Sequence, residues 1–365
     1  MFTLCAIFFL AWALISLGGE KPRIDRPIVY LYGLLIVAFA LGVPGGAEPA
    51  NGAAEWAKFL AQSSGFFIIF ASLQRVPDGM ARLGSGFGLS GLLVLVTLYF
   101  ILFVQIGKPN FHPVHQLLED NLPFLTLFIL YYLQQRGFKP WNPLVLLCLA
   151  ATIGYLVLAQ GRAALLGLVV GLLCYGGLVL KWRARSLAAA AVIISALAGL
   201  YAGEFFKGQW TRHAILKAVD DLTSHRSVLW RQAIAAPPDN LLIGVGMGNA
   251  HRNKAMMRME IGRLKRVKEA KHLHNFLLDA WYETGIIGLM SLLAWLGLML
   301  RRGVRAWRSA DGFAQQHAGL FLAASMAILT SALFSFSYRS KPFSIYLFIF
   351  LAALAFLDQS RRTVP

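Results

Sequence analysis

Long apolar runs separated by short polar connections make up most of the chain. Each run approaches the roughly 20 residues that a helix needs to cross the hydrocarbon core of a bilayer. The runs predict membrane-spanning helices, and the first is expected to be retained because it lacks the positively charged start of a cleavable signal peptide. Eleven segments are expected, near residues 2–17, 28–43, 56–74, 86–107, 117–133, 143–160, 163–180, 186–203, 285–300, 313–336 and 342–357.

The composition agrees with this interpretation. Hydrophobic residues make up 58% of the 365 residues, and the mean hydropathy is +0.61. A formal charge of +17 could indicate nucleic-acid binding, but the basic residues lie mainly in short connections and one long insert, and no nucleic-acid-binding motif is present. Cys5, Cys148 and Cys174 lie inside apolar runs without metal-binding spacing, so they predict neither a metal site nor disulfides.

The sequence therefore predicts an all-α polytopic membrane protein. About 11–12 transmembrane helices are expected, with one long loop that itself contains helices. Three parts follow from the pattern: amino-terminal helices in 1–203, the loop in 204–284 and carboxyl-terminal helices in 285–365. We expect these parts to form one integrated unit.

Lysine and arginine residues are concentrated in alternate connections, and this predicts the orientation of the chain. Five connections and the carboxyl-terminal tail on one side hold sixteen of them, whereas the short connections on the other side hold only Lys108, Arg162, Arg339 and Lys341. The positive-inside rule places the richer side, and with it the carboxyl terminus, in the cytoplasm. The long insert then faces outward, and an odd number of helices places the amino terminus outside as well.

The insert has thirteen basic and eight acidic residues. Its first part, to about residue 222, has the helical periodicity and aromatic side chains of an interfacial helix. A short helix is expected next, broken at Pro237 and Pro238. Residues 251–271, with eight basic and two acidic residues, predict an exposed basic helix, which is either a solvated face or a docking surface for phosphate-bearing lipid or glycan.

A glycine turn lies between these two segments, with Gly244, Gly246 and Gly248. A dinucleotide site needs a strand before such glycines and a helix after them, and a P-loop needs a following Gly-Lys-Ser/Thr, so no nucleotide site is expected. The glycines instead predict a tight turn that shapes a cavity wall.

Side chains that can carry chemistry lie where the insert meets the next apolar segment. His272 and His274 precede Asn275, which is expected to cap a helix. Residues four, seven and eleven positions after His274, the last of them Gly285, would share one helical stripe with its imidazole. Gly285 and Gly288 would let another helix or a lipid tail approach closely.

Three arginines are further candidates for functional residues. Arg162 lies at the outer junction of two apolar segments, and Arg226 and Arg231 lie in the insert. A charge at a membrane boundary must face water, a partner or the protein interior, so each is either a functional cation or a side chain that snorkels to the headgroups. No matched set of outer ligands surrounds the two histidines, so no metal is expected.

Three blocks occur in order: GRAALLGL around Arg162, RSVLW followed by DNLLIGVGMGN from Arg226, and HNFLLDAWYETGIIGL from His274. Together they resemble the O-antigen ligase and O-antigen polymerase superfamily of membrane glycosyltransferases. The spacing from His274 and Asn275 to Gly285-x-x-Gly288 is similar to the histidine motif of lipopolysaccharide O-antigen ligases. Such ligases usually have twelve helices with both ends in the cytoplasm, so the eleven segments depart from the family pattern at the amino terminus.

The resemblance implies a type C-like glycosyltransferase in the bacterial inner membrane, with its site facing the periplasm. It implies inverting transfer of an O-antigen glycan from undecaprenyl diphosphate to the lipid A–core oligosaccharide, without metal, nucleotide or other cofactor. His274 would be the general base, because a neutral imidazole can take a hydroxyl proton near neutral pH. Arg162 and Arg226 would stabilise the diphosphate leaving group, with His272 and Arg231 in supporting roles. The expected partners are the lipid-linked glycan donor, the lipid A–core acceptor and membrane lipids, and no nucleic acid.

Two alternatives stay open. An O-antigen polymerase or a protein O-oligosaccharyltransferase of the same superfamily would use a similar donor with another acceptor. A polysaccharide transporter or flippase would not catalyse transfer, but such proteins more often show paired inverted repeats, and no clear internal repeat is present.

Overall fold

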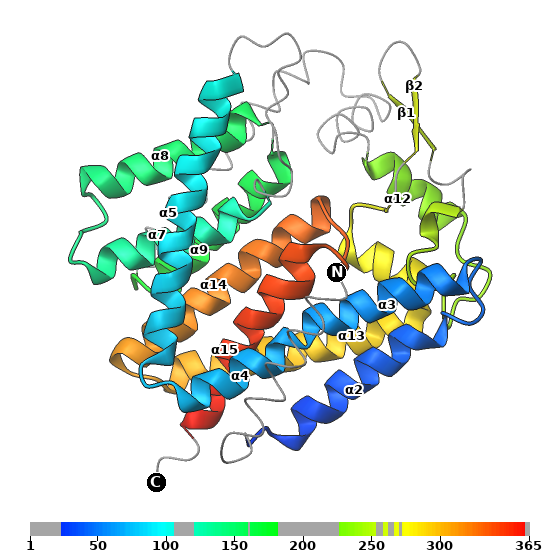
Figure 1. Ribbon diagram of the computed structural model, residues 1–365, viewed down its shortest axis with the longest axis horizontal. Helices are drawn as coiled ribbons and strands as arrows, with labels where there is room; N and C mark the ends of the chain where they lie inside the picture. Colours follow the sequence, from blue (N-terminus) through cyan, green and yellow to red (C-terminus); the bar gives the residue numbers. More distant parts are fainter. Residues whose placement is uncertain are drawn as a thin grey trace.

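The computed structural model of the protein is a bundle of apolar helices (Figure 1). The structure describes residues 23–105, 120–159, 161–181, 226–252, 258–261, 266–269 and 272–361. The predicted segments 2–17 and 186–203, and the predicted interfacial helix at the start of the insert, lie outside the described residues. The described elements are α2 (Arg26–Leu41), α3 (Pro49–Ser63), α4 (Gly65–Arg75), α5 (Gly79–Gln105), α7 (Leu122–Gln135), α8 (Pro143–Leu158), α9 (Arg162–Leu178), α12 (Arg226–Ala235), η1 (Ala250–Arg252), β1 (Arg258–Ile261), β2 (Arg266–Glu269), α13 (Phe276–Ser309), α14 (Gly312–Phe334), the π-helical turn η2 (Pro342–Leu347) and α15 (Phe348–Ser360).

Five stretches of helix in the described part are long and apolar enough to cross a membrane, and four shorter apolar helices accompany them. Together these nine correspond to nine of the eleven predicted segments. The outer face of α5 supports the same conclusion, because Phe103 is 76% exposed and Leu93, Val96 and Phe100 are nearly as open. A continuous apolar face of this kind is typical of contact with lipid. The all-α, multi-pass membrane class is confirmed.

Helix α14 lies at the centre of the bundle, between α7 and α9 on one flank and α13 and α15 on the other (Figure 1). Three rings from α7, α14 and α15 meet there: the centroids of Phe128, Phe321 and Phe350 are 5.2–5.6 Å apart. Close backbone packing joins α14 to α9, since a Cβ on Gly171 would lie 2.9 Å from Cβ of Ala327. Helix α14, at whose carboxyl end the site lies, is therefore packed on both flanks.

The connections gather at two opposite ends of the bundle. At one end, Arg302 pairs with Asp25 at 2.6 Å and with Asp358 at 3.4 Å. At the other end, Arg339 pairs with Glu55 at 2.9 Å. Among the described residues, the first end holds connections predicted to face the cytoplasm, and the second holds the described part of the insert and the connection that carries Arg339 (Figure 1). Which end faces the cytoplasm stays a prediction.

The predicted basic helix in residues 251–271 is wrong. Strands β1 and β2 pair antiparallel there, with Arg258 opposite Glu269 and Ile261 opposite Arg266 (Figure 1). A high density of like charges disfavours a helix through repulsion between residues three and four apart. The β-branched residues Ile261 and Val267 favour strands instead.

Candidate functional site

The glycine turn fits into a break in α13. Gly285 has φ 65° and ψ −169°, so the helix is interrupted at the residue where the sequence pattern predicts that the membrane span begins. The amides of Ile286 and Ile287 donate to the carbonyls of Leu241 and Leu242, at 2.9 and 3.2 Å, in place of partners within the helix. The segment that leads into the glycine turn therefore supplies the carbonyl acceptors that these amides lose at the break in α13.

The turn also satisfies the helical carbonyls on the other side of the break. The amides of Val245 and Gly246 donate to the carbonyls of Tyr282 and Glu283, at 3.1 and 2.9 Å. Gly246 has φ 87°, and the other two glycines of the turn also have positive φ. The prediction of a tight glycine turn is confirmed, and a backbone segment approaches Gly285 where the sequence had indicated a helix or a lipid tail.

Asn275 is the N-cap of α13. Its side-chain oxygen accepts hydrogen bonds from the amides of Leu277 and Leu278, at 3.0 and 3.1 Å. Its side-chain nitrogen donates to the carbonyl of Leu333, at 3.0 Å. Asn275 therefore caps α13 and also joins the start of α13 to the end of α14 by a hydrogen bond.

His274 does not lie on α13, so the predicted stripe with Leu278, Trp281 and Gly285 is wrong. Its φ of 55° is left-handed, and the helix begins two residues later. An N-cap requires extended backbone, which Asn275 has with φ −148° and ψ 116°, and the chain turns sharply just before it. The imidazole bonds instead to the carbonyl of Ser335, just after α14.

Three side chains from the insert and its junction bond to consecutive carbonyls at the end of α14. Nδ1 of His274 bonds to the carbonyl of Ser335 at 2.7 Å, Arg226 donates to the carbonyl of Phe334, and Asn275 donates to that of Leu333. The last four carbonyls of a helix have no partner within it, so these side chains supply bonds that the helix end needs. The end of α14 thereby brings two predicted site residues, His274 and Arg226, to one place.

The bond from His274 fixes the tautomer of its neutral ring. A carbonyl oxygen can only accept, so Nδ1 must carry the hydrogen. Nε2 of the neutral ring is then the nitrogen with a lone pair, which can accept a proton. The geometry suits a general base that uses Nε2.

Arg162 is brought to the same end of the bundle. It is the first residue of α9, and the hydroxyl of Ser331 in α14 donates to the carbonyl of the next residue, Ala163, at 3.3 Å. A Cβ on Gly167, one turn further, would lie 2.0 Å from the Ser331 hydroxyl. Because Ser331 lies one turn before Ser335, Arg162 begins its helix beside the last turn of α14.

The end of α14, where His274 and Arg226 meet, is the centre of the candidate site. The remaining predicted residues lie around this centre. The ring centroids of His272 and His274 are 4.1 Å apart, and Nδ1 of His272 accepts the amide hydrogen of His274 at 3.3 Å. Trp230 donates from its indole nitrogen to the carbonyl of Leu273, at 2.9 Å, and so holds α12 against the histidine loop. Arg231, the next residue of α12, is exposed.

A buried ionic cluster beside this centre could not be found from the sequence. Arg339 donates to Glu55 at 2.9 Å and to Glu283 at 2.8 Å, and the Tyr338 hydroxyl donates to the second oxygen of Glu283, at 2.8 Å. Burial alone would lower the pKa of Arg339, but Glu283 and the neighbouring carboxylates raise it above its ordinary value. The cluster fixes the connection from α14 to α15, which follows the carbonyls bound by His274 and Arg226.

Asp120 joins the centre to a cavity. The Ser335 hydroxyl donates to Oδ1 of Asp120, at 3.3 Å. Burial raises the pKa of Asp120 to about 6, against the opposing effects of the Ser335 hydroxyl and the charge of Arg226. No motif singled out this residue, because its only signal is a carboxylate at the edge of an apolar run.

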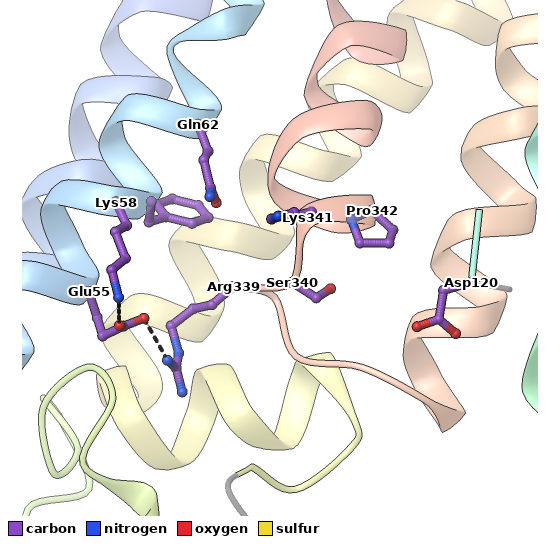
Figure 2. A pocket seen from close by; sticks show the side chains of 9 residues that line it. Glu55, Lys58, Gln62, Asp120, Arg339, Ser340, Lys341 and Pro342 are labelled. Atoms are coloured by element: carbon purple, nitrogen blue, oxygen red, sulfur yellow. Dashed lines mark hydrogen bonds and ion pairs between the residues drawn. The ribbon is translucent and has the colours of Figure 1, made fainter. Parts of the chain in front are cut away.

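The cavity has a volume of 310 Å³ and opens between α3, Asp120 and the connection from α14 to α15 (Figure 2). Its walls carry both acids and bases. The lining residues are Glu55, Lys58, Phe59, Gln62, Asp120, Arg339, Ser340, Lys341 and Pro342.

Comparison with known proteins gives one family match. No curated protein matches the chain. A family model described as O-Antigen ligase matches residues 144–293, somewhat less than half of the chain. The matched region begins in α8 and ends in α13, and it includes Arg162, Arg226 and His274. This match agrees with the resemblance seen in the sequence blocks: over residues 144–293 the chain is similar to the O-antigen ligase family.

Proposed function

We propose that this membrane protein is an O-antigen ligase of the bacterial inner membrane, which transfers a glycan from undecaprenyl diphosphate to the lipid A–core oligosaccharide at the periplasmic face. The observation that carries the proposal is the meeting of His274 and Arg226 at the last carbonyls of α14. The family match supports O-antigen processing in general, and the specific donor, acceptor and membrane side belong to the proposal.

In the proposed reaction, Nε2 of His274 takes the proton of the acceptor hydroxyl. The hydroxyl oxygen then bonds to the anomeric carbon as the bond from that carbon to the diphosphate oxygen breaks, which inverts the configuration. The bond between Nδ1 and the carbonyl of Ser335 holds the ring in the required tautomer. No metal or other cofactor enters this mechanism.

The leaving diphosphate gains negative charge as the bond breaks, and fixed cations can stabilise that charge. Arg226 is held by its bond to the carbonyl of Phe334, so its guanidinium is oriented in advance. Arg162 occupies the first turn of α9, where the amino end of the helix also favours an anion. We assign diphosphate binding to these two arginines, with His272 supporting His274 and Arg231 contributing at the exposed face of α12.

The test is restoration of ligation in a Gram-negative strain that lacks its ligase but still makes lipid-linked O-polysaccharide. The wild-type protein is expected to restore a lipopolysaccharide ladder on a gel, and His274→Ala is expected to abolish it while remaining in the membrane. His251→Ala is the matched control, because Nδ1 of His251 also bonds to a backbone carbonyl, that of Gly248 at 2.8 Å. A ladder with His274→Ala would refute the proposed base.

The alternatives give different products in the same strain. A polymerase would lengthen the carrier-linked glycan, and a protein O-oligosaccharyltransferase would attach it to protein, each without modifying the lipid A–core. A transporter would yield none of these products, and histidine substitution would leave glycan chemistry unchanged.

A further inference from the structure

The cavity beside the proposed centre is lined by both acidic and basic side chains. Asp120 and Glu55 present carboxylates, whereas Lys58, Arg339 and Lys341 present cations (Figure 2). A phosphate group would meet the two carboxylates, and a metal cation would meet the three basic side chains. The lining therefore favours a neutral ligand that both donates and accepts hydrogen bonds, as sugar hydroxyls do.

Two buried polar atoms on the cavity walls have no hydrogen-bond partner among the described residues. They are Nε of Arg339 and the hydroxyl of Ser340. Leaving a buried polar atom without a partner costs free energy, so such atoms in a cavity wall indicate a ligand that supplies the missing bonds. Figure 2 shows the Ser340 side chain between α3 and Asp120, directed toward the latter.

The cavity is also of suitable size and surface for a sugar ring. Its 310 Å³ lies at the lower end of the roughly 300–1,000 Å³ range of small-molecule sites, which favours a single ring over an extended chain. Phe59 and Pro342 add apolar surface, against which the C–H groups of a saccharide can pack.

Two hydrogen bonds link the cavity wall to His274. Asp120 accepts the hydrogen bond of the Ser335 hydroxyl, and the carbonyl of Ser335 is bonded to Nδ1 of His274. A ring bound beside Asp120 would therefore lie next to the residues that hold the proposed base.

We propose that this cavity, lined by Asp120, Arg339 and Ser340, is a subsite for one neutral saccharide ring of a glycan substrate. The inference rests on the proposed function, since it assumes a glycan donor and a glycan acceptor. Either substrate could supply the ring, and the experiment below distinguishes them.

The first test measures binding without turnover. Lys341→Cys is made in a full-length chain whose three native cysteines are replaced by alanine, and its maleimide labelling is followed in nanodiscs. The three probes are lipid A–core, undecaprenyl diphosphate carrying the O-glycan, and undecaprenyl diphosphate alone. Lys139→Cys is the matched control, because Lys139 is an exposed lysine in a connection at the opposite end of the bundle.

One of the two glycan-bearing probes is expected to slow labelling at position 341 about tenfold when present at about ten times its Kd, and to leave position 139 unchanged. The probe that protects identifies the source of the ring. Equal protection by the bare carrier, or no protection by any probe, would overturn the subsite.

The second test uses Ser340→Ala. Its hydroxyl has no partner among the described residues, so the substitution removes no bond that the fold uses. A lost hydrogen bond to the ring is expected to raise KM for the protecting substrate about 3- to 10-fold with kcat unchanged, because the bond is made equally before and during reaction. An unchanged KM for both substrates would contradict the assignment.

These results separate the two proposals. Ligation by the wild type without protection at position 341 would overturn the subsite and leave the ligase function intact. Protection by a glycan-bearing probe in a protein that transfers no glycan would overturn the ligase function and leave a saccharide site.

Discussion

Gly285→Ala is expected to be strongly destabilising, because Gly285 combines a backbone conformation that only glycine adopts readily with a close contact. Its φ of 65° and ψ of −169° lie in a region that costs other residues about 1–3 kcal/mol. A Cβ there would lie 2.2 Å from the carbonyl oxygen of Leu242, and overpacking of this kind costs about 1–3 kcal/mol more. The expected loss is therefore about 2–6 kcal/mol.

The assay is thermal unfolding of the purified protein in one detergent, with Gly297→Ala as the control. Gly297 lies in the same helix, and a Cβ there would meet nothing within 4 Å. Alanine at that position is expected to be neutral or to stabilise by at most about 1 kcal/mol through helix propensity. At about 2 °C per kcal/mol for a protein of this size, Gly285→Ala should lower Tm by about 4–12 °C.

Ligation should fall with Gly285→Ala as well, because the same break in α13 receives the glycine turn that follows α12. If the two alanine variants unfold at the same temperature, then the break is not required by the fold, and the reasoning that links it to the glycine turn is wrong.

Three further predictions follow from the site. Burial holds the pKa of Asp120 near 6, above its ordinary 3.8, so the folded protein binds a proton more tightly than the unfolded chain and loses stability as pH rises from about 4 to 6. Asp120→Asn should remove that part of the pH dependence in a series of Tm measurements, and identical profiles would contradict it. Arg226→Lys keeps the charge but not the planar fork, so kcat/KM for ligation should fall at least about tenfold, whereas Arg231→Ala on the exposed face of α12 should change it by less than about threefold. Glu283→Gln removes a fully buried partner of an ion pair and should cost about 3 kcal/mol of unfolding free energy, while Glu55→Gln, at a partly exposed partner, should cost less in the same denaturation assay.

The sequence predicted the features that depend on neighbouring residues. Apolar length located nine helices of the described part, and the preference of asparagine for helix starts identified Asn275 as a cap. The glycine turn was predicted because glycine tolerates positive φ, which Gly246 has at 87°. Each of these follows from local chain chemistry, so the sequence alone was sufficient.

The features that sequence reasoning missed depend on residues far apart in the chain. Glu55, Glu283 and Arg339 are brought together only by packing of α3 against α13 and the connection after α14, and no spacing signals that meeting. The orientation of His274 was wrong for a related reason. Helical periodicity was extended back through a residue whose backbone is turned by the cap that follows it.

The arrangement of α9 and α14 explains how one site can favour both a proton acceptor and an anion. The carboxyl end of α14 carries partial negative charge, so it favours the cationic Arg226 and the positive charge that His274 would take up in the proposed transfer. The amino end of α9 lies beside it and carries the opposite partial charge together with Arg162, so it favours a diphosphate. Opposite helix ends placed side by side keep the two charges of the proposed transition state apart, each next to a terminus of the opposite sign. This placement needs the close contact of Gly167 with Ser331, where a Cβ would force the two helices apart.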